Sequence, residues 1–232
     1  MKKKIRTFVI GDIHGGYKAL VQCLDRSKFD FEKDRLISLG DVADGWPEVA
    51  ECFEELMEIK NLVMVRGNHD NWLLDYLRFE ETPDIWITQG GRNSFASYQK
   101  NSELKEKHRD FLMKTPYSYV DEKNRLFVHG GLNRKFPIGE QSAEDLMWNR
   151  DLWYESEHYS SAGDPVFVTE FDTVFVGHTS IWKTSQVPLK SGNVWFLDSG
   201  GGWEGKLSLM NVDTEEVFQS DLLEELYPKG HN

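Results

Sequence analysis

The stretch that decides the fold is Thr7-Phe8-Val9-Ile10-Gly11-Asp12-Ile13-His14-Gly15. A short apolar run ends here at a glycine, and an aspartate and a histidine follow it two positions apart. Residues two apart on an extended chain point the same way, so Asp12 and His14 can reach one ion while Ile13 packs inward. The stretch therefore predicts a β-strand with metal-binding side chains at its carboxyl end.

The same arrangement recurs further along the chain. The strand-like runs and the polar residues behind them are 36–39 with Asp41 and Asp44, 62–65 with Asn68 and His69, 126–128 with His129, and 174–176 with His178. Ligands gather at the carboxyl ends of parallel strands. Each residue alone is also typical of a turn, a helix cap or a packed core histidine. Together, oxygen and imidazole ligands without thiolates predict a site for manganese, iron or zinc.

The segments between these runs indicate the fold class. Apolar residues at helical spacing predict helices over about 17–24, 49–56 and 104–112, whereas the chain beyond Val174 reads as strands joined by turns. Strands alternating with helices predict an α/β protein, a layered sandwich. We expect one domain over residues 1–232, with a loop at 155–164.

Composition excludes several classes of function. The chain has 232 residues, of which 39% are hydrophobic, and its net charge of −12 disfavours nucleic acid as a partner. Its apolar runs are far shorter than the ~20 residues that cross a bilayer, so no membrane association is expected. The basic start is followed by too short an apolar core for a signal peptide. With two cysteines, Cys23 and Cys52, a disulfide framework is implausible, and we expect a cytoplasmic protein.

The ordered motifs resemble a known family. They are Gly11-Asp12-Ile13-His14-Gly15, Gly40-Asp41-Val42-Ala43-Asp44, Gly67-Asn68-His69-Asp70, His129-Gly130-Gly131 and Gly177-His178-Thr179. The set resembles the calcineurin-like metallophosphoesterases, most closely the branch that holds serine/threonine protein phosphatases, bacterial and phage protein phosphatases and symmetrical diadenosine tetraphosphate hydrolases. The resemblance implies a four-layer αββα sandwich with two mixed β-sheets.

It also implies roles for the residues. Asp12 and His14 would hold a first divalent ion, Asp41 would bridge two ions, and Asn68, His129 and His178 would hold the second. The resemblance implies two divalent metal ions; manganese is the favoured metal, and iron or zinc is the alternative. His69 would be the general acid, with Asp44 orienting its imidazole, and a hydroxide bridging the metals would attack phosphorus directly.

One motif departs from the family pattern. The protein phosphatases of this branch have Asp-Arg-Gly where this chain has Asp44-Gly45-Trp46, so an arginine that grips the substrate phosphate is missing. Arg150 is the predicted catalytic substitute, because Trp148-Asn149-Arg150 resembles a Trp-x-Arg segment of the bacterial phosphatases. Arg66 and Arg92 are weaker candidates, and a surface salt bridge is the alternative for each of the three.

Three functions follow from these observations. The leading one is a serine/threonine protein phosphatase that acts on a phosphoprotein or a small phosphate ester. The second is a symmetrical dinucleoside polyphosphate hydrolase or nucleotidase, which the net charge of −12 makes less favourable. The third is a scaffold without catalysis, which the complete set of implied ligands argues against. The sequence leaves the physiological substrate, the metal in the cell and the oligomeric state open.

Overall fold

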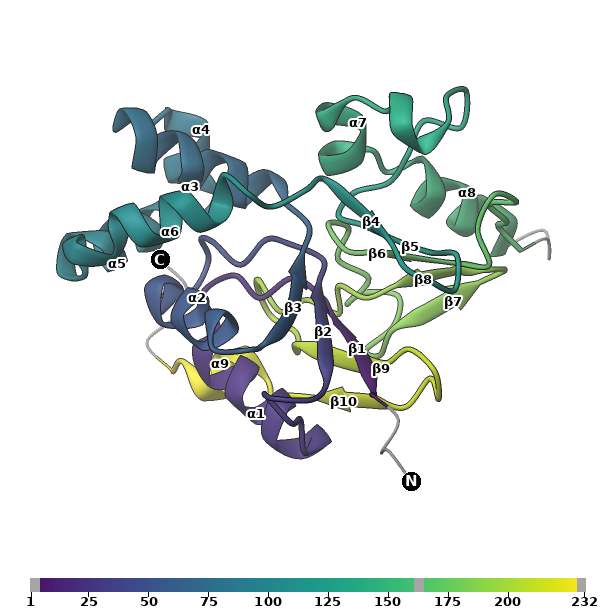
Figure 1. Ribbon diagram of the computed structural model, residues 1–232, viewed down its shortest axis with the longest axis horizontal. Helices are drawn as coiled ribbons and strands as arrows, with labels where there is room; N and C mark the ends of the chain where they lie inside the picture. Colours follow the sequence, from purple (N-terminus) through teal and green to yellow (C-terminus); the bar gives the residue numbers. More distant parts are fainter. Residues whose placement is uncertain (1–4, 161–164, 229–232) are drawn as a thin grey trace.

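The computed structural model describes residues 5–160 and 165–228, and its centre is a pair of β-sheets (Figure 1). The first sheet has the order β10 (Val217–Gln219), β9 (Ser208–Asn211), β1 (Thr7–Ile10), β2 (Arg35–Ser38) and β3 (Asn61–Met64). The second has the order β4 (Ser118–Val120), β5 (Arg125–Val128), β6 (Thr173–Val176), β8 (Val194–Phe196) and β7 (Leu189–Ser191). In the first sheet β1, β2 and β3 are parallel to one another and β9 and β10 continue the sheet antiparallel. In the second sheet β5, β6 and β8 are parallel and the two edge strands are antiparallel, so both sheets are mixed.

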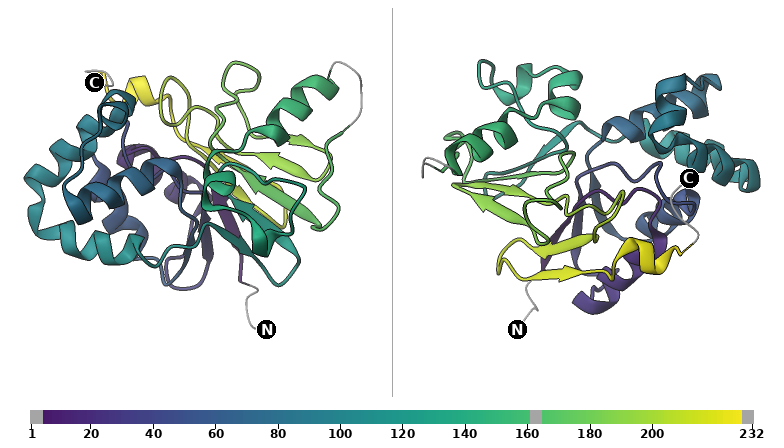
Figure 2. Two further views of the ribbon diagram at one scale, coloured as in Figure 1. Left: turned by 90° about the horizontal axis from the view of Figure 1, so that it is seen from above. Right: turned by 180° about the vertical axis from the view of Figure 1, so that it is seen from behind.

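Helices enclose the pair of sheets (Figure 2). The helices are α1 (Tyr17–Ser27), α2 (Val49–Met57), α3 (Asn68–Phe79), α4 (Asp84–Trp86), α5 (Arg92–Lys100), α6 (Lys105–Leu112), α7 (Ala143–Trp148), α8 (Asp151–Ser160) and α9 (Leu223–Leu226). A π-helical turn, Ile87–Gly91, joins α4 to α5, and short 3-10 turns lie at Ser102–Leu104 and Ile138–Glu140. Within the described residues, no helix is long and apolar enough to span a membrane.

Alternating side chains divide the interior into three apolar layers. On β1, Phe8 and Ile10 pack under the helices, whereas Val9 packs between the sheets. Between the sheets, Phe127 of β5 stacks on Phe175 of β6 with ring centroids 4.8 Å apart. A third layer joins the second sheet to α7 and α8. Strands buried on both faces explain why their sequences are continuously apolar.

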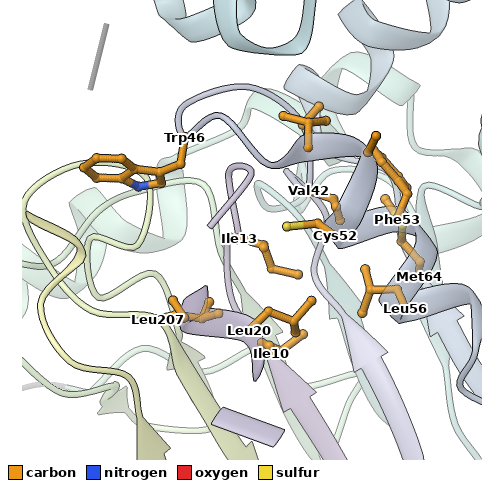
Figure 3. Close-up of a cluster of buried hydrophobic side chains, with 14 of the residues drawn as sticks. Ile10, Ile13, Leu20, Val42, Trp46, Cys52, Phe53, Leu56, Met64 and Leu207 are labelled. Atoms are coloured by element: carbon orange, nitrogen blue, oxygen red, sulfur yellow. The ribbon is translucent and has the colours of Figure 1, made fainter. Parts of the chain in front are cut away.

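The helical layer beside the first sheet is densely packed (Figure 3). Leu20 of α1 lies beside Ile10 of β1, and Phe53 of α2 belongs to the same apolar cluster; all three are fully buried. Cys23 and Cys52 lie in the same layer as free, buried thiols. Full burial of apolar side chains contributes about 1.5–3 kcal/mol each, so this layer fixes the loops that follow β1 and β2.

The structure confirms the α/β sandwich and the strands expected from the apolar runs, with bounds shifted by one residue in places. The expected loop at 155–164 is wrong for residues 155–160, which continue helix α8, and residues 161–164 lie outside the described part. The helix is favoured there because Leu152 and Trp153 in its first turns are buried against the second sheet. Strands β4, β7 and β10, which are edge strands of three residues, were not predicted from the sequence.

Candidate metal centre

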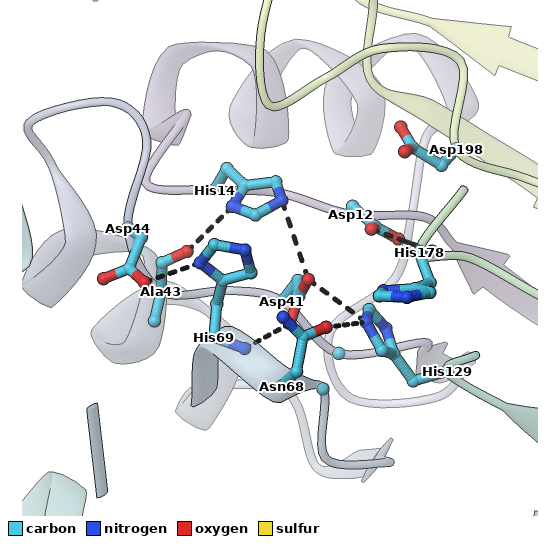
Figure 4. A network of polar contacts seen from close by, with 12 residues as sticks. Asp12, His14, Asp41, Ala43, Asp44, Asn68, His69, His129, His178 and Asp198 are labelled. Atoms are coloured by element: carbon cyan, nitrogen blue, oxygen red, sulfur yellow. Dashed lines mark hydrogen bonds and ion pairs between the residues drawn. The ribbon is translucent and has the colours of Figure 1, made fainter. Parts of the chain in front are cut away.

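The polar residues that follow the strands meet at one edge of the sandwich (Figure 4). One group with ligand atoms within 4.8 Å of one another comprises His14, Asp41 and His69. A second group comprises Asp41, His129 and His178. Asp41 belongs to both groups, which is the arrangement expected of a residue between two ions.

Backbone carbonyls orient two of the imidazoles. Nδ1 of His14 lies 3.0 Å from the carbonyl oxygen of Ala43, and Nδ1 of His129 lies 2.8 Å from that of Leu39. A carbonyl only accepts, so each Nδ1 carries a hydrogen, and in the neutral ring the lone pair is then on Nε2. These Nε2 atoms lie 3.7 Å and 3.1 Å from Oδ2 of Asp41. In metal sites a histidine ligand usually donates its second ring N–H to a carbonyl or a carboxylate, and both rings have this arrangement here.

The segment that begins α3 completes this side of the site. Oδ1 of Asn68 lies 3.0 Å from Nε2 of His129, and the backbone N–H of His69 donates to Oδ1 of Asp41 at 2.9 Å. Asp70, which the sequence analysis quoted only as part of a motif, accepts hydrogen bonds from the backbone N–H groups of Val42, Ala43 and Gly67. It therefore ties the loop after β2 to the start of α3.

Asp12 lies on the other side of Asp41 and differs in its contacts. Its carboxylate accepts the backbone N–H of His178 at 3.0 and 3.2 Å, and it is outside both three-residue groups. A second buried carboxylate, Asp198, lies near it and accepts the N–H of Gly200 at 2.9 Å (Figure 4). Asp198 was not predicted as a site residue, although it follows β8 as the other polar residues follow their strands.

The electrostatics of the site suit divalent cations. Burial, with Asp198 and Asp41 nearby, raises the pKa of Asp12 well above its usual value. Burial lowers the pKa of His14 to about 3 and that of His178 to about 2, so both imidazoles are neutral. Among the described residues, Nε2 of His178 is buried without a hydrogen-bond partner. Crowded buried carboxylates and a buried imidazole nitrogen without a partner are costly without a cation. Carboxylates and neutral imidazoles are also the ligands that manganese, iron and zinc bind.

His69 and Asp44 form a hydrogen-bonded pair beside the proposed ions. Nδ1 of His69 lies 2.7 Å from Oδ2 of Asp44, and both side chains are buried. Burial lowers the pKa of His69, but the carboxylates of Asp41 and Asp44 outweigh it and raise the pKa to about 9. A protonated imidazole held in this way can donate a proton from Nε2.

The arginine candidates differ in their surroundings. Arg150 is half-buried, and its charge acts on His178. Arg66 is buried and donates to Thr115 and to the carbonyl of Leu112, so it serves the fold instead of the site. Arg92 is exposed at the start of α5.

The structure also shows why position 45 holds glycine. Gly45 has φ +71°, and a Cβ there would lie 2.7 Å from Cβ of His14. An arginine does not fit this backbone. The neighbouring Trp46 is buried, donates to the carbonyl of Gly201 at 2.8 Å, and stacks on Tyr227. It therefore does not line a substrate groove.

The two mixed sheets, with carboxylates and imidazoles converging on a shared aspartate, define a metallophosphoesterase. The family model for calcineurin-like phosphoesterases matches residues 5–181, and the chain belongs to this family. The family depends on a dinuclear metal centre, and the chain is an enzyme that hydrolyses phosphate esters, which removes the scaffold alternative.

The relatives have two kinds of name. Serine/threonine-protein phosphatase 1 of Salmonella typhimurium is 26% identical over 206 residues, which cover 88% of this chain and 91% of that protein. A symmetrical bis(5'-nucleosyl)-tetraphosphatase of Pseudomonas fluorescens is 25% identical, with 91% and 93% covered. A solved structure described as a candidate diadenosine tetraphosphatase has a TM-score of 0.68 at 18% identity and covers 94% of each chain, which supports the fold alone.

Proposed function

We propose that this enzyme is a protein phosphatase that hydrolyses the phosphomonoesters of serine and threonine. It would use two divalent metal ions, with manganese as the favoured metal. The observation that carries the choice is the supply of positive charge. Arg150 acts on the site, whereas Arg66 is committed to the fold and position 45 excludes an arginine. One guanidinium matches a single phosphoryl group, while a tetraphosphate chain calls for several cations.

The chain's own residues would divide the work as follows. His14, Asp41, Asn68, His129 and His178 would hold the ions, together with Asp12, and the bound ions would supply Lewis acidity at the phosphoryl group. Arg150 would bind phosphoryl oxygens. His69 would donate the proton from Nε2 to the departing serine or threonine oxygen, while Asp44 holds Nδ1. None of these steps needs a covalent enzyme intermediate.

The second candidate is a symmetrical dinucleoside polyphosphate hydrolase, and one observation favours it. Trp72 and Trp148 bridge the site edge to edge: His69 to Trp72 is 5.0 Å, Trp72 to Trp148 is 5.3 Å, and Trp148 to His178 is 5.6 Å between ring centroids. Both indoles are half-buried, whereas Trp153 belongs to the core. Exposed indole surface beside the site could stack on a nucleobase.

A substrate comparison decides between the two. The purified enzyme with added Mn²⁺ is given a phosphoserine peptide and diadenosine tetraphosphate at equal concentrations, and kcat/KM is measured for each. We expect the peptide to be preferred; exclusive turnover of the dinucleotide would reverse the ranking. His69→Asn is the catalytic control, because it should retain bound metal while slowing the peptide reaction by about 10²–10⁴-fold.

We also propose the cytoplasm as the location of the enzyme. Cys23 and Cys52 are both buried, free thiols, as is usual in a reducing compartment. Fractionation of cells that make the tagged protein tests this; recovery outside the cytoplasmic fraction would contradict it.

A further inference from the structure

The carboxylate of Asp44 is held from a distant segment of the chain. The hydroxyl of Ser94 donates to Oδ1 at 2.6 Å, and the indole N–H of Trp86 lies 2.9 Å from both oxygens. The backbone N–H of Asp44 in turn donates to the Ser94 hydroxyl at 2.9 Å. Asp44, Trp86 and Ser94 are all fully buried.

The geometry selects one oxygen for the histidine. Ser94 occupies Oδ1, which leaves Oδ2 for Nδ1 of His69 at 2.7 Å. Trp86 contacts both oxygens, so it fixes the plane of the carboxylate. Without these donors the carboxylate could rotate, and the ring that hydrogen-bonds to it would lose its fixed direction.

The segment that carries Trp86 and Ser94 also contacts the residue that follows Asp44. Gly90, in the π-helical turn, has φ +97°, and a Cβ there would lie 2.7 Å from the backbone nitrogen of Gly45. The Asn93 side chain donates to the carbonyl of Gly45. The contact is therefore close on both sides of Asp44, and little space remains for the carboxylate to move.

We propose that Trp86 and Ser94 are positioning residues for the general acid: by fixing the carboxylate of Asp44 they keep Nε2 of His69 aimed at the departing oxygen. The inference rests on the proposed function. It assigns to α4 and α5, which carry none of the metal-site residues, a part in proton donation.

Kinetics with two esters test this. Proton donation matters for a phosphoserine peptide, whose alkoxide leaves poorly, and little for p-nitrophenyl phosphate. Ser94→Ala and Trp86→Phe should lower kcat for the peptide about tenfold or more while KM, bound metal and p-nitrophenyl phosphate turnover change less than about twofold. Ser94→Thr, which keeps the hydroxyl, should restore the rate.

A double-mutant cycle separates positioning from a general structural role. Combined with His69→Asn, Ser94→Ala should slow the peptide reaction no further, since the group that it positions is gone. The matched control is Ser97→Ala on the same helix, a buried serine whose hydroxyl accepts the N–H of Ala50 at 3.1 Å, and it should leave the ratio of the two esters unchanged. Equal slowing of both esters, an additive double mutant, or the same effect from Ser97→Ala would overturn the inference.

A spectroscopic readout needs no substrate. In the zinc-loaded enzyme, the Nδ1 proton of His69 should give a downfield resonance that persists in Ser94→Thr and Ser97→Ala and is shifted or lost in Ser94→Ala and Trp86→Phe. An unchanged resonance in the last two variants would refute the inference. If the resonance behaves as expected but the enzyme hydrolyses no phosphomonoester, the proposed function fails and the positioning role stands.

Discussion

Removal of two arginine side chains should have opposite consequences. Arg150 is half-buried and its charge acts on His178, and in the proposed function it binds the phosphoryl group. Among the described contacts, its guanidinium makes no hydrogen bond or ion pair that the fold depends on. A charge-assisted hydrogen bond contributes about 1.5–3 kcal/mol, and about 1.4 kcal/mol is a factor of ten. Arg150→Ala should therefore lower kcat/KM for a phosphopeptide by roughly 10–150-fold and leave Tm almost unchanged.

Arg66 should behave in the other way. Its guanidinium donates to the hydroxyls of Thr115 and Tyr117 and to the carbonyls of Leu112 and Thr115. Even at the about 0.5–1.5 kcal/mol of a neutral hydrogen bond, the four bonds give roughly 2–6 kcal/mol of folding free energy. Since about 1 kcal/mol shifts Tm by roughly 2–4 °C in a chain of this size, Arg66→Ala should unfold at a clearly lower temperature.

The assay compares both variants with Arg134→Ala, whose guanidinium pairs with Glu155 at 2.8 Å on the surface. Initial rates at low phosphopeptide concentration give kcat/KM, thermal unfolding gives Tm, and metal analysis confirms loading. An Arg150→Ala enzyme within about twofold of the parent, with metal bound, refutes the phosphate-binding role. An Arg66→Ala enzyme with unchanged Tm and weakened substrate binding would show that the two arginines were assigned in the wrong order.

Three further perturbations have defined outcomes. In thermal unfolding scans, removal of the metal with EDTA should lower Tm by roughly 5–11 °C per ion, if each ion was present at about a hundred times its Kd. Asp41→Asn should abolish this shift. Burial raises the pKa of Cys23 to about 12 and raises that of Cys52, so the native enzyme at pH 8 should leave Ellman's reagent unreacted, whereas both thiols react in guanidinium. Gly45→Arg, which introduces the arginine of the protein phosphatases that the chain resembles, should lower kcat/KM and cost about 1–3 kcal/mol of stability by unfolding titration, and a gain in activity would contradict the steric argument.

The central strands could be predicted because their own sequences carry the signal. After their first residues, Thr7 and Arg125, strands β1 and β5 are apolar without interruption, because they are buried on both faces. Edge strands such as β7, with the exposed Lys190 at its centre, pair with one neighbour only and owe their conformation to that neighbour. Nothing in three residues of mixed polarity distinguishes such a strand from a loop.

The site could be predicted only as far as its residues stand directly behind a strand. The metal-site histidines and carboxylates do so, and Asp198 could have been found by the same rule. The groups that orient them come from other parts of the chain: the Leu39 carbonyl holds His129 from 90 positions away, and Ser94 holds Asp44 from 50. Such partners are fixed by the packing of whole elements, which a local pattern does not contain.

The backbone of the site indicates how its loops are kept in place. His14, Asp41, Asp44 and His178 all have left-handed φ values, of 47°, 46°, 70° and 64°, which cost about 1–3 kcal/mol for a residue other than glycine. The loops hold one another in these conformations, because the Asp41 carbonyl accepts the N–H groups of both Ile13 and His14, at 3.0 and 2.8 Å. Asp41 therefore joins the two loops through its backbone and the two proposed ions through its side chain. Asp41→Asn therefore replaces the carboxylate that would bind metal and keeps the backbone hydrogen bonds between the two loops. This variant can separate the loss of metal from the loss of the fold.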